Sequence, residues 1–251
     1  MQITPEDGYA YVLYQAGAST RGRRFAADHA ECVFINGPSQ KVVGAIAADI
    51  RRRAAEAGRD PADIAIFTMM TAICAPTRAE ARAKYEEYAA LADGDGALAL
   101  MSGWTGLDFG AMPPDEPLRF TDKANAMVSA LEGFTVSDPD RVWTPREIAR
   151  HAAIGGRGPV VVGSYEDVAD AFQEWVEATG IDGFNLAYAV SPGTFADIAD
   201  GVAPILRGRG AYKAEYAPGT LREKLFGPGR ARLPASHPAA KLRRSTTEGT
   251  P

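Results

Sequence analysis

Short apolar runs alternate along this chain with longer segments whose apolar residues recur at helical spacing. The runs are Ala10–Tyr14, Cys32–Ile35, Ile64–Ala75 and Phe184–Val190. None of them alternates polar and apolar positions, so each is predicted to be a strand buried on both faces. Buried strands separated by amphipathic helices are typical of parallel βαβ units. The pattern therefore predicts an α/β protein with about four such units, either a small open sheet or part of a (β/α)8 barrel, which needs eight.

The segments between the runs carry start and stop signals for helices. Lys41–Ala57 has apolar residues at helical spacing, and Gly58 is predicted to end that helix. Further helices are expected to begin at capping boxes, in which a Ser or Thr precedes a carboxylate by three residues. These boxes are Thr77–Glu80, Thr144–Glu147, Ser164–Asp167 and Thr194–Asp197.

Three glycines, Gly155, Gly156 and Gly158, could suggest a dinucleotide-binding loop. They follow a predicted helix and precede the strand-like run Val160–Val162, whereas a dinucleotide loop follows a strand and precedes a helix. We therefore interpret them as a helix-to-strand connection.

Residues 92–141 interrupt the alternation with many glycines and prolines, and are predicted to form a long insertion between barrel elements. Long insertions in compact domains are usually lids or binding loops. Four apolar residues in it could line a substrate pocket or could anchor the insertion onto the helices: Met101, Trp104, Phe109 and Phe120. The sequence favours neither alternative.

Charge is distributed unevenly along the chain. The net charge is −5, and residues 228–251 carry five basic residues against Glu248, a sum of +4, so residues 1–227 carry −9. An acidic body argues against nucleic acid as a partner. Residues 228–251 are rich in Pro, Gly, Ser and Thr and are predicted to be a disordered basic tail after a domain of residues 1–227. There is no apolar stretch long enough for a membrane span and no signal-peptide pattern, so we expect no membrane partner and a cytoplasmic protein.

No residue pattern indicates a metal site or an activated nucleophile. Cys32 and Cys74 lie in apolar runs and are predicted to be buried and reduced. His29, His151 and His237 lack zinc-site spacing, and a nucleophile pair of His29 with Cys32 is not favoured at a helix-to-strand junction. No Gly-x-Ser-x-Gly elbow is present. If the protein is an enzyme, a cofactor is expected to carry the chemistry.

The first βα junction is the best candidate for a binding site. The strand ending near Gln15 leads into Gly17, Ala18 and Ser19, and a helix follows at once. Gly17 permits a tight turn, and the small residues beside it leave backbone N–H groups uncovered. A helix N-terminus adds free N–H groups and a positive dipole, while Ser19 and Thr20 add hydroxyl donors. These features suit a phosphate, although a plain turn capped by Ser19 fits them too.

The segment QAGASTRGRRFAADHAECVF resembles the luciferase-like flavin monooxygenases. It is most similar to the subgroup of nitrilotriacetate and dibenzothiophene-sulfone monooxygenases. SGWTGLDF, VVGSYEDVADAFQEWVEATGIDGFNL and GTLREKLFG agree in the same order, so the resemblance extends to about Gly227. QAGAS together with DGFNL is fairly specific, whereas GSYEDVAD alone is weak.

The resemblance implies a (β/α)8 barrel that binds reduced FMN supplied by a separate flavin reductase and that oxygenates a small organic substrate. It places the contacts to the FMN phosphate at Gly17, Ala18, Ser19 and Thr20. It assigns no catalytic residue. A homo-oligomer is also expected.

The position of QAGAS departs from the family pattern. In family members this motif lies near the middle of a chain about twice as long, whereas here it begins at residue 15. This chain is therefore expected to hold the C-terminal half of the barrel and to need an N-terminal half. A truncated gene product, a split enzyme and a misplaced start codon all remain open. The alternatives are a non-catalytic remnant or assembly partner, and a barrel that uses a deazaflavin.

Overall fold

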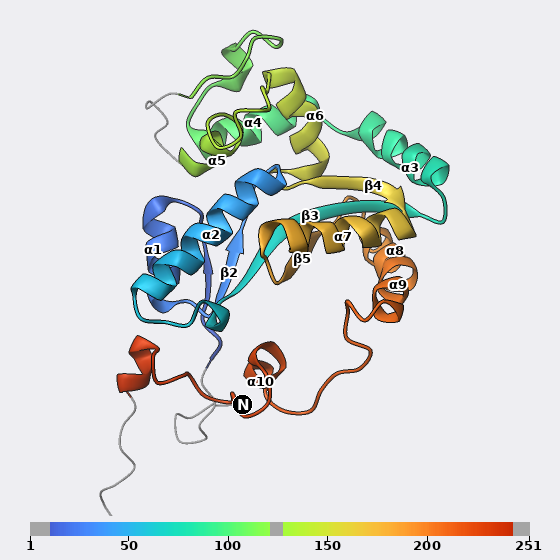
Figure 1. Cartoon of the computed structure of the whole chain (residues 1–251). Helices are drawn as coiled ribbons and strands as arrows, with labels where there is room; N and C mark the ends of the chain where they lie inside the picture. Colours follow the sequence, from blue (N-terminus) through green and yellow to red (C-terminus); the bar gives the residue numbers. More distant parts are fainter. Residues whose placement is uncertain (1–10, 121–127, 243–251) are drawn as a thin grey trace, which may run out of the picture. The chain divides into compact units, whose positions relative to one another are not determined.

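The computed structural model describes residues 11–120 and 128–242, where strands and helices alternate (Figure 1). The first half contains β1 (Tyr14–Ala16), α1 (Thr20–His29), β2 (Cys32–Ile35), α2 (Gln40–Glu56), η2 (Pro61–Asp63), β3 (Ala65–Ala75), α3 (Arg78–Leu91), α4 (Gly94–Thr105) and η3 (Phe109–Ala111). The second half contains α5 (Val128–Gly133), α6 (Pro145–Gly155), β4 (Val160–Ser164), α7 (Tyr165–Thr179), β5 (Gly183–Ala187), α8 (Gly193–Asp197), η4 (Ile198–Val202), α9 (Ala203–Gly208), α10 (Leu221–Phe226) and η5 (Pro238–Leu242).

Hydrogen bonding orders the strands as β1-β2-β3-β4, with β5 also paired to β3. The long strand β3 serves two partners along its length. Its residues Phe67–Thr71 run parallel to β5, and Thr71–Ala75 run parallel to β4. The parallel pairing confirms the predicted α/β class. The described residues contain five strands rather than four, because the strand-like run at Val160 forms β4.

The chain divides into two compact units, of which the first comprises residues 1–33, 49–65 and 215–251. Within it, β1 and β2 are joined where the N–H groups of Glu31 and Cys32 both donate to the carbonyl of Leu13, at 2.9 and 3.0 Å. Arg23 of α1 forms an ion pair with Asp49 at 3.0 Å. The apolar interior is built from small and branched residues that include Ala26, Ala27, Val33, Ile50, Ala54 and Ile64.

The second unit comprises residues 34–48 and 66–214. Here α7 packs against β4 and α9. Its buried residues Val168, Phe172 and Trp175 form the apolar side of α7, and Phe172 stacks on Phe184 of β5 with ring centroids 4.6 Å apart. The predicted glycine connection is confirmed, since α6 ends at Gly155 and β4 begins at Val160.

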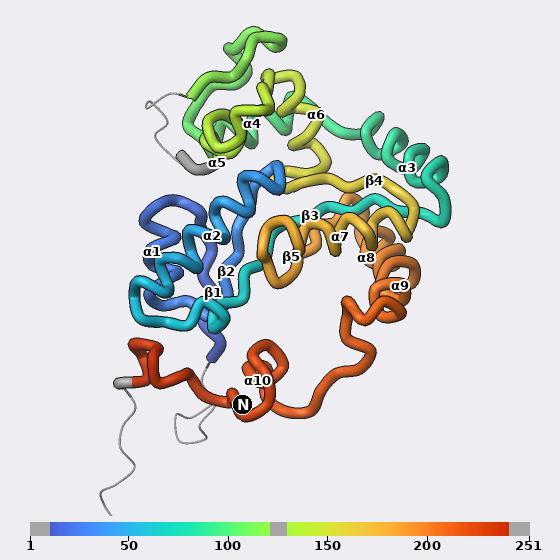
Figure 2. The backbone as a smooth tube through the Cα atoms, viewed as in Figure 1, coloured from blue at the N-terminus to red at the C-terminus, as the bar shows by residue number. Residues whose placement is uncertain are grey.

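The predicted insertion contains more helix than its glycines and prolines suggest. In Figure 2 the helices α4, α5 and α6 lie together, and α4 packs on both of the others. They enclose a separate apolar cluster of Ala97, Met101, Phe109, Phe134, Trp143, Ile148 and Ala152. Most of the segment is therefore a small packed subdomain rather than an open loop, although residues 121–127 lie outside the described part.

Three of the four predicted capping boxes are confirmed, those at Thr77, Thr144 and Ser164. The box predicted at Thr194 is wrong, because α8 already begins at Gly193 and has no side-chain cap. The Thr194 hydroxyl instead accepts from the N–H groups of Ala189 and Val190, both at 3.2 Å. A box that was not predicted, at Thr220, opens α10.

The segment expected to form a disordered tail has defined contacts as far as Ala240, whose N–H donates to the carbonyl of His237. Arg230 forms an ion pair with Asp63, and His237 is buried with an exposed fraction of 1%. The last part of that predicted tail, residues 243–251, lies outside the described residues.

Candidate functional site

The junction between β1 and α1 has the predicted order of strand, short loop and helix. β1 ends at Ala16 and α1 begins at Thr20. Gly17 between them has φ +140°, a conformation that residues with a side chain rarely adopt. Ser19 is the N-cap of α1, where its Oγ accepts a hydrogen bond from the Gly22 N–H at 3.1 Å. The two interpretations from the sequence are therefore compatible, because a capping hydroxyl that accepts one bond still has its own hydrogen to donate.

Several donors at this helix end are directed to solvent. Ser19 and Thr20 are exposed, and within the described residues no hydrogen bond engages the N–H groups of Thr20 and Arg21. The first turn of α1 contains no acidic residue, and Arg21 and Arg24 are exposed on this helix. Free N–H groups, a hydroxyl and positive charge together are what a phosphate monoester binds.

Two further residues shape this loop, and the sequence analysis had not assigned them. A Cβ on Gly22 would lie 3.1 Å from the carbonyl oxygen of Gly17 and 3.2 Å from Ser19 Oγ, so glycine lets the loop fold back on the first turn. Gln15 donates from Nε2 to its neighbouring carbonyl at Ala16, at 2.9 Å. Its Oε1 is buried and has no hydrogen-bond partner among the described residues. The QAGAS motif had marked the loop, but not these roles.

The far end of β3 contains a polar cluster in the second unit. Lys84 of α3 donates to the carbonyl of Cys74 at 2.8 Å and to Asp197 at 2.7 Å. Burial, with the nearby negative charge of Asp197, raises the pKa of the Cys74 thiol to about 11. Both cysteines are buried, as predicted. A thiol with so high a pKa is protonated at neutral pH and is a poor nucleophile.

The four candidate pocket residues separate into two kinds. Met101 and Phe109 lie in the core of the helical subdomain, each with an exposed fraction of 1%. Trp104 and Phe120 are half-buried, and the guanidinium of Arg157 lies 5.1 Å from the centre of the Trp104 indole. The buried pair has the contacts of the anchoring alternative. A substrate-lining role for any of the four stays a prediction.

The histidines lie in three different environments. His29 at the end of α1 contacts the ring of Phe25, with centroids 4.9 Å apart. His151 packs against Trp143 in the helical subdomain, and burial lowers its pKa. His237 belongs to the C-terminal segment, and its Nε2 lies 3.0 Å from the carbonyl oxygen of His29.

Residues 11–120 and 128–242 contain neither a cluster of metal ligands nor a helix that could cross a membrane. No three side chains of His, Cys, Asp or Glu converge there in a way that could hold a metal ion. In the same residues, no helix combines the length and the apolar character that crossing a membrane requires.

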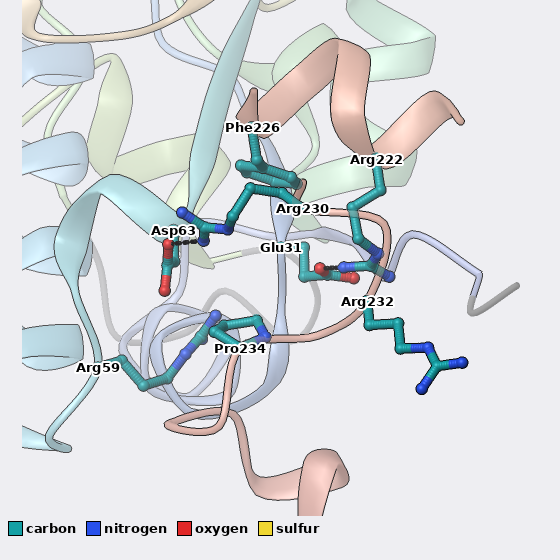
Figure 3. A pocket seen from close by; sticks show the side chains of 8 residues that line it. All are labelled: Glu31, Arg59, Asp63, Arg222, Phe226, Arg230, Arg232 and Pro234. Carbon is teal, nitrogen blue, oxygen red and sulfur yellow. Dashed lines mark hydrogen bonds and ion pairs between the residues drawn. The ribbon is translucent and has the colours of Figure 1, made fainter. Parts of the chain in front are cut away.

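A shallow pocket in the first unit is lined by four arginines, two carboxylates, a phenylalanine and a proline. Figure 3 shows Arg222 and Arg230 reaching Glu31 and Asp63 respectively, while Arg232 points away from both pairs. These side chains leave no room between them for a water molecule. Two ion pairs, Arg222–Glu31 and Arg230–Asp63, thus fill this pocket, and the β1–α1 junction is the better candidate for a ligand.

Comparison with known proteins places this chain beside a group of oxygenating enzymes. A sequence model of the luciferase-like monooxygenase family matches residues 1–183. The dimethyl-sulfide monooxygenase of Hyphomicrobium sulfonivorans is 45% identical over 232 residues, which are 92% of this chain and 48% of that protein. The dibenzothiophene-sulfone monooxygenase of Rhodococcus erythropolis is 33% identical over 218 residues, which are 85% of this chain and 48% of that protein. The chain thus spans about half the length of these curated relatives.

Solved structures agree with the sequence matches. The crystal structure of the Hyphomicrobium protein superposes with a TM-score of 0.79, covering 92% of this chain and 49% of that one. A riboflavin lyase, crystallised with modified FMN and riboflavin, is 34% identical with a TM-score of 0.79, and the match covers 93% of this chain and 51% of the lyase chain.

A further relative by sequence belongs to the predicted subgroup. The nitrilotriacetate monooxygenase component A of Aminobacter aminovorans is 29% identical over 223 residues, which are 88% of this chain and 49% of that protein. The resemblance inferred from the QAGAS and DGFNL segments is confirmed.

Proposed function

Because this chain belongs to the luciferase-like monooxygenase family, we propose that it is the phosphate-holding half of a reduced-FMN-dependent monooxygenase. The observation that carries the proposal is the uncommitted donor set at the β1–α1 junction. Ser19, whose Oγ already accepts from Gly22, has a hydroxyl hydrogen to donate, and the N–H groups of Thr20 and Arg21 lie beside it. The positive end of the α1 dipole favours a dianion at this place.

The residues present fit an FMN phosphate in three respects. Gly17 and Ala18 put no bulky side chain over the loop. The positive φ of Gly17 turns the chain between strand and helix. No carboxylate in the first turn of α1 repels an anion. When bound, reduced FMN would supply the reaction with oxygen, and these residues would fix its phosphate end while taking no part in proton or electron transfer.

A complete activity is proposed to need more than the described residues. The chain covers 48% of the dimethyl-sulfide monooxygenase, and the described residues provide five strands where a (β/α)8 barrel has eight. An oxygenation site has to exclude water from the reacting flavin. We therefore propose that an N-terminal half completes the site, that a separate flavin reductase supplies reduced FMN, and that the substrate is a small organic molecule. A cytoplasmic location and a homo-oligomer stay predictions.

Two other functions are less well supported. The non-catalytic assembly partner would not need a loop with free anion-binding donors, which this chain has. The deazaflavin alternative finds no support among the relatives with more than 30% identity, one of which was crystallised with modified FMN.

The experiment that tests the proposal compares FMN with riboflavin, which has the same ring but no phosphate. Both are titrated into the 251-residue chain and followed by quenching of flavin fluorescence. If the phosphate is held as proposed, FMN binds at least tenfold more tightly than riboflavin, which corresponds to about 1.4 kcal/mol. Equal affinity for the two flavins would contradict the proposal.

A further inference from the structure

Arg59 holds the end of α1 that lies opposite to the proposed phosphate site. Its guanidinium donates from Nη1 to the carbonyl of Ala27 at 2.6 Å and from Nη2 to that of Ala30 at 2.7 Å. Nη1 also reaches the carbonyl of Ala26 at 3.4 Å. The last carbonyls of a helix have no partner within the helix. The Ala26 carbonyl also accepts from the Ala30 N–H at 2.9 Å, so the side chain of Arg59 adds partners chiefly for the carbonyls of Ala27 and Ala30.

The position of Arg59 follows from the way α2 ends. Gly58 has φ +78°, and the N–H of Arg59 returns to the carbonyl of Ala54 at 2.9 Å. This is the hydrogen-bonding pattern of a helix closed by a left-handed glycine. It reverses the chain direction immediately after α2, and Arg59 is the first residue after the reversal.

The burial of Arg59 is costly, and no carboxylate among the described residues forms an ion pair with it. The residue has an exposed fraction of 3%, and burial lowers its pKa, opposed by the more distant charges of Asp63 and Asp28. Its two amino groups bind helix carbonyls, and its Nε has no partner within the described part of the chain. A buried guanidinium that binds only carbonyls gains most from the negative end of the α1 dipole.

We propose that Arg59 is a positioning residue for the phosphate loop, an inference that rests on the proposed function. An α-helix of ten residues is about 15 Å long, so Arg59 acts from well outside contact distance of the phosphate. It fixes the C-terminal end of α1, and so keeps the direction in which the Thr20 and Arg21 N–H groups point. His237 adds a further contact to the same end through the carbonyl of His29.

Arg51 provides a matched control in the same unit. It lies near the C-terminal end of α2, and its Nη1 also donates to backbone carbonyls, those of Pro61 at 2.8 Å and Ile64 at 3.2 Å. These carbonyls belong to η2 and the start of β3, not to α1. Replacing either arginine removes charge-assisted bonds to the backbone. The bonds of Arg59 reach carbonyls at the end of α1, whereas the Arg51 bonds given above reach η2 and the start of β3.

The test measures the ratio of the FMN and riboflavin dissociation constants in Arg59→Met and Arg51→Met, using the 251-residue chain. Arg59→Met is expected to lower the preference for FMN by about threefold to tenfold, while riboflavin affinity is unchanged. Arg51→Met is expected to lower the melting temperature comparably and to leave the ratio unchanged. Arg59→Lys, which keeps the charge and one donor group, is expected to recover part of the preference.

The outcomes separate this inference from the proposed function. If the wild-type chain shows no preference for FMN, the proposed function fails. If the wild type shows the preference and Arg59→Met retains it, the role of Arg59 is overturned. The same conclusion applies if both methionine variants lower the ratio equally, since a general loss of stability would then explain it. Should Arg59→Met fail to fold, the ratio for the milder Arg59→Lys decides by the same criterion.

Discussion

Ser19 and Gly22 are joined by a hydrogen bond of 3.1 Å, from the N–H of Gly22 to the hydroxyl oxygen of Ser19. The bond caps α1 and also directs the Ser19 side chain over the first turn of the helix. Since the hydroxyl oxygen is the acceptor, its hydrogen remains for a ligand. A helix cap and a phosphate contact can thus be properties of one side chain, and substitutions at Ser19 can separate them.

Ser19→Ala removes both properties. It is expected to weaken FMN binding roughly tenfold, about 1.4 kcal/mol, since hydrogen bonds to charged groups are worth slightly more than this. It also costs α1 its cap, by about 1 kcal/mol. Flavin fluorescence titration and thermal unfolding measure the two effects on the same sample.

Ser19→Asp keeps the cap but adds a negative charge at the proposed phosphate position. We expect unfolding to occur at the wild-type temperature or above it, because aspartate is as good an N-cap as serine. FMN affinity is expected to fall further than in Ser19→Ala, through repulsion of the phosphate, whereas riboflavin affinity is unchanged. Wild-type affinity of Ser19→Asp for FMN would show that no phosphate binds here.

His237 predicts a dependence of stability on pH. Its Nε2 donates to the carbonyl of His29, and its Nδ1 accepts from the N–H of Ala239 at 3.1 Å, so the folded protein holds the neutral ring. Burial lowers the pKa of His237, and the positive charge of Arg59 acts in the same direction, against the bond to His29. The neutral form is favoured on folding, so this stability is present above the ordinary pKa of about 6.5 and is lost as pH falls through the lowered value.

Urea unfolding of the wild type and of His237→Gln between pH 7.5 and pH 5 measures this contribution. The glutamine keeps a donor for the His29 carbonyl but does not titrate. We expect the difference in free energy of unfolding between the two proteins to shrink as pH falls. A difference that is constant over this range would rule out His237 as the titrating group.

Met101 and Trp104 distinguish the two interpretations of the helical subdomain. Met101→Ala is expected to lower the free energy of unfolding by about 2–4 kcal/mol, because the side chain is buried in an apolar cluster. Trp104 is half-buried beside Arg157, so Trp104→Phe should cost less stability. If Trp104 lines the substrate pocket, Trp104→Phe instead lowers kcat/KM of the completed enzyme. An unchanged kcat/KM would leave anchoring as its role.

The edge of the sheet predicts self-association of the isolated chain. β1 stands at one end of the hydrogen-bonded strand order and is an edge strand. Tyr11 and Tyr14, before and in this strand, are largely exposed. Unpaired strand edges and exposed apolar side chains favour association. Sedimentation velocity at micromolar concentration should detect oligomers or aggregates. A stable monomer would show that this edge is protected in solution.

Local signals in the sequence predicted the elements well where one residue type determines the backbone. Gly58 marked the end of α2, and the boxes at Thr77, Thr144 and Ser164 marked helix starts, because caps act within one turn. The capping box predicted at Thr194 does not form, because the Thr194 hydroxyl accepts from N–H groups that precede it in the chain. The helices of the insertion were missed because glycines mask helical spacing, although α4 retains Asp93 as an N-cap.

The candidate site was predictable only in part, for a physical reason. Gly17 and Ser19 lie two positions apart in the short sequence motif that forms the loop. Arg59 reaches α1 from 29 or more positions away, and nothing in its neighbourhood in sequence indicates which carbonyls it binds. Such long-range contacts depend on the tertiary fold, so the sequence alone could not assign them.

The central claim is most directly tested by the product formed per reduced FMN consumed. The measurement is made on the 251-residue chain alone and again with an N-terminal barrel half in trans, using a panel of amino-polycarboxylates, sulfones and alkanesulfonates. Because we propose that this chain supplies only part of a barrel, which leaves the reacting flavin open to water, we expect the chain alone to consume flavin with no oxygenated product and to release hydrogen peroxide at most. Product formation is expected to appear when the N-terminal half is added. Stoichiometric product from the 251-residue chain alone would contradict the account.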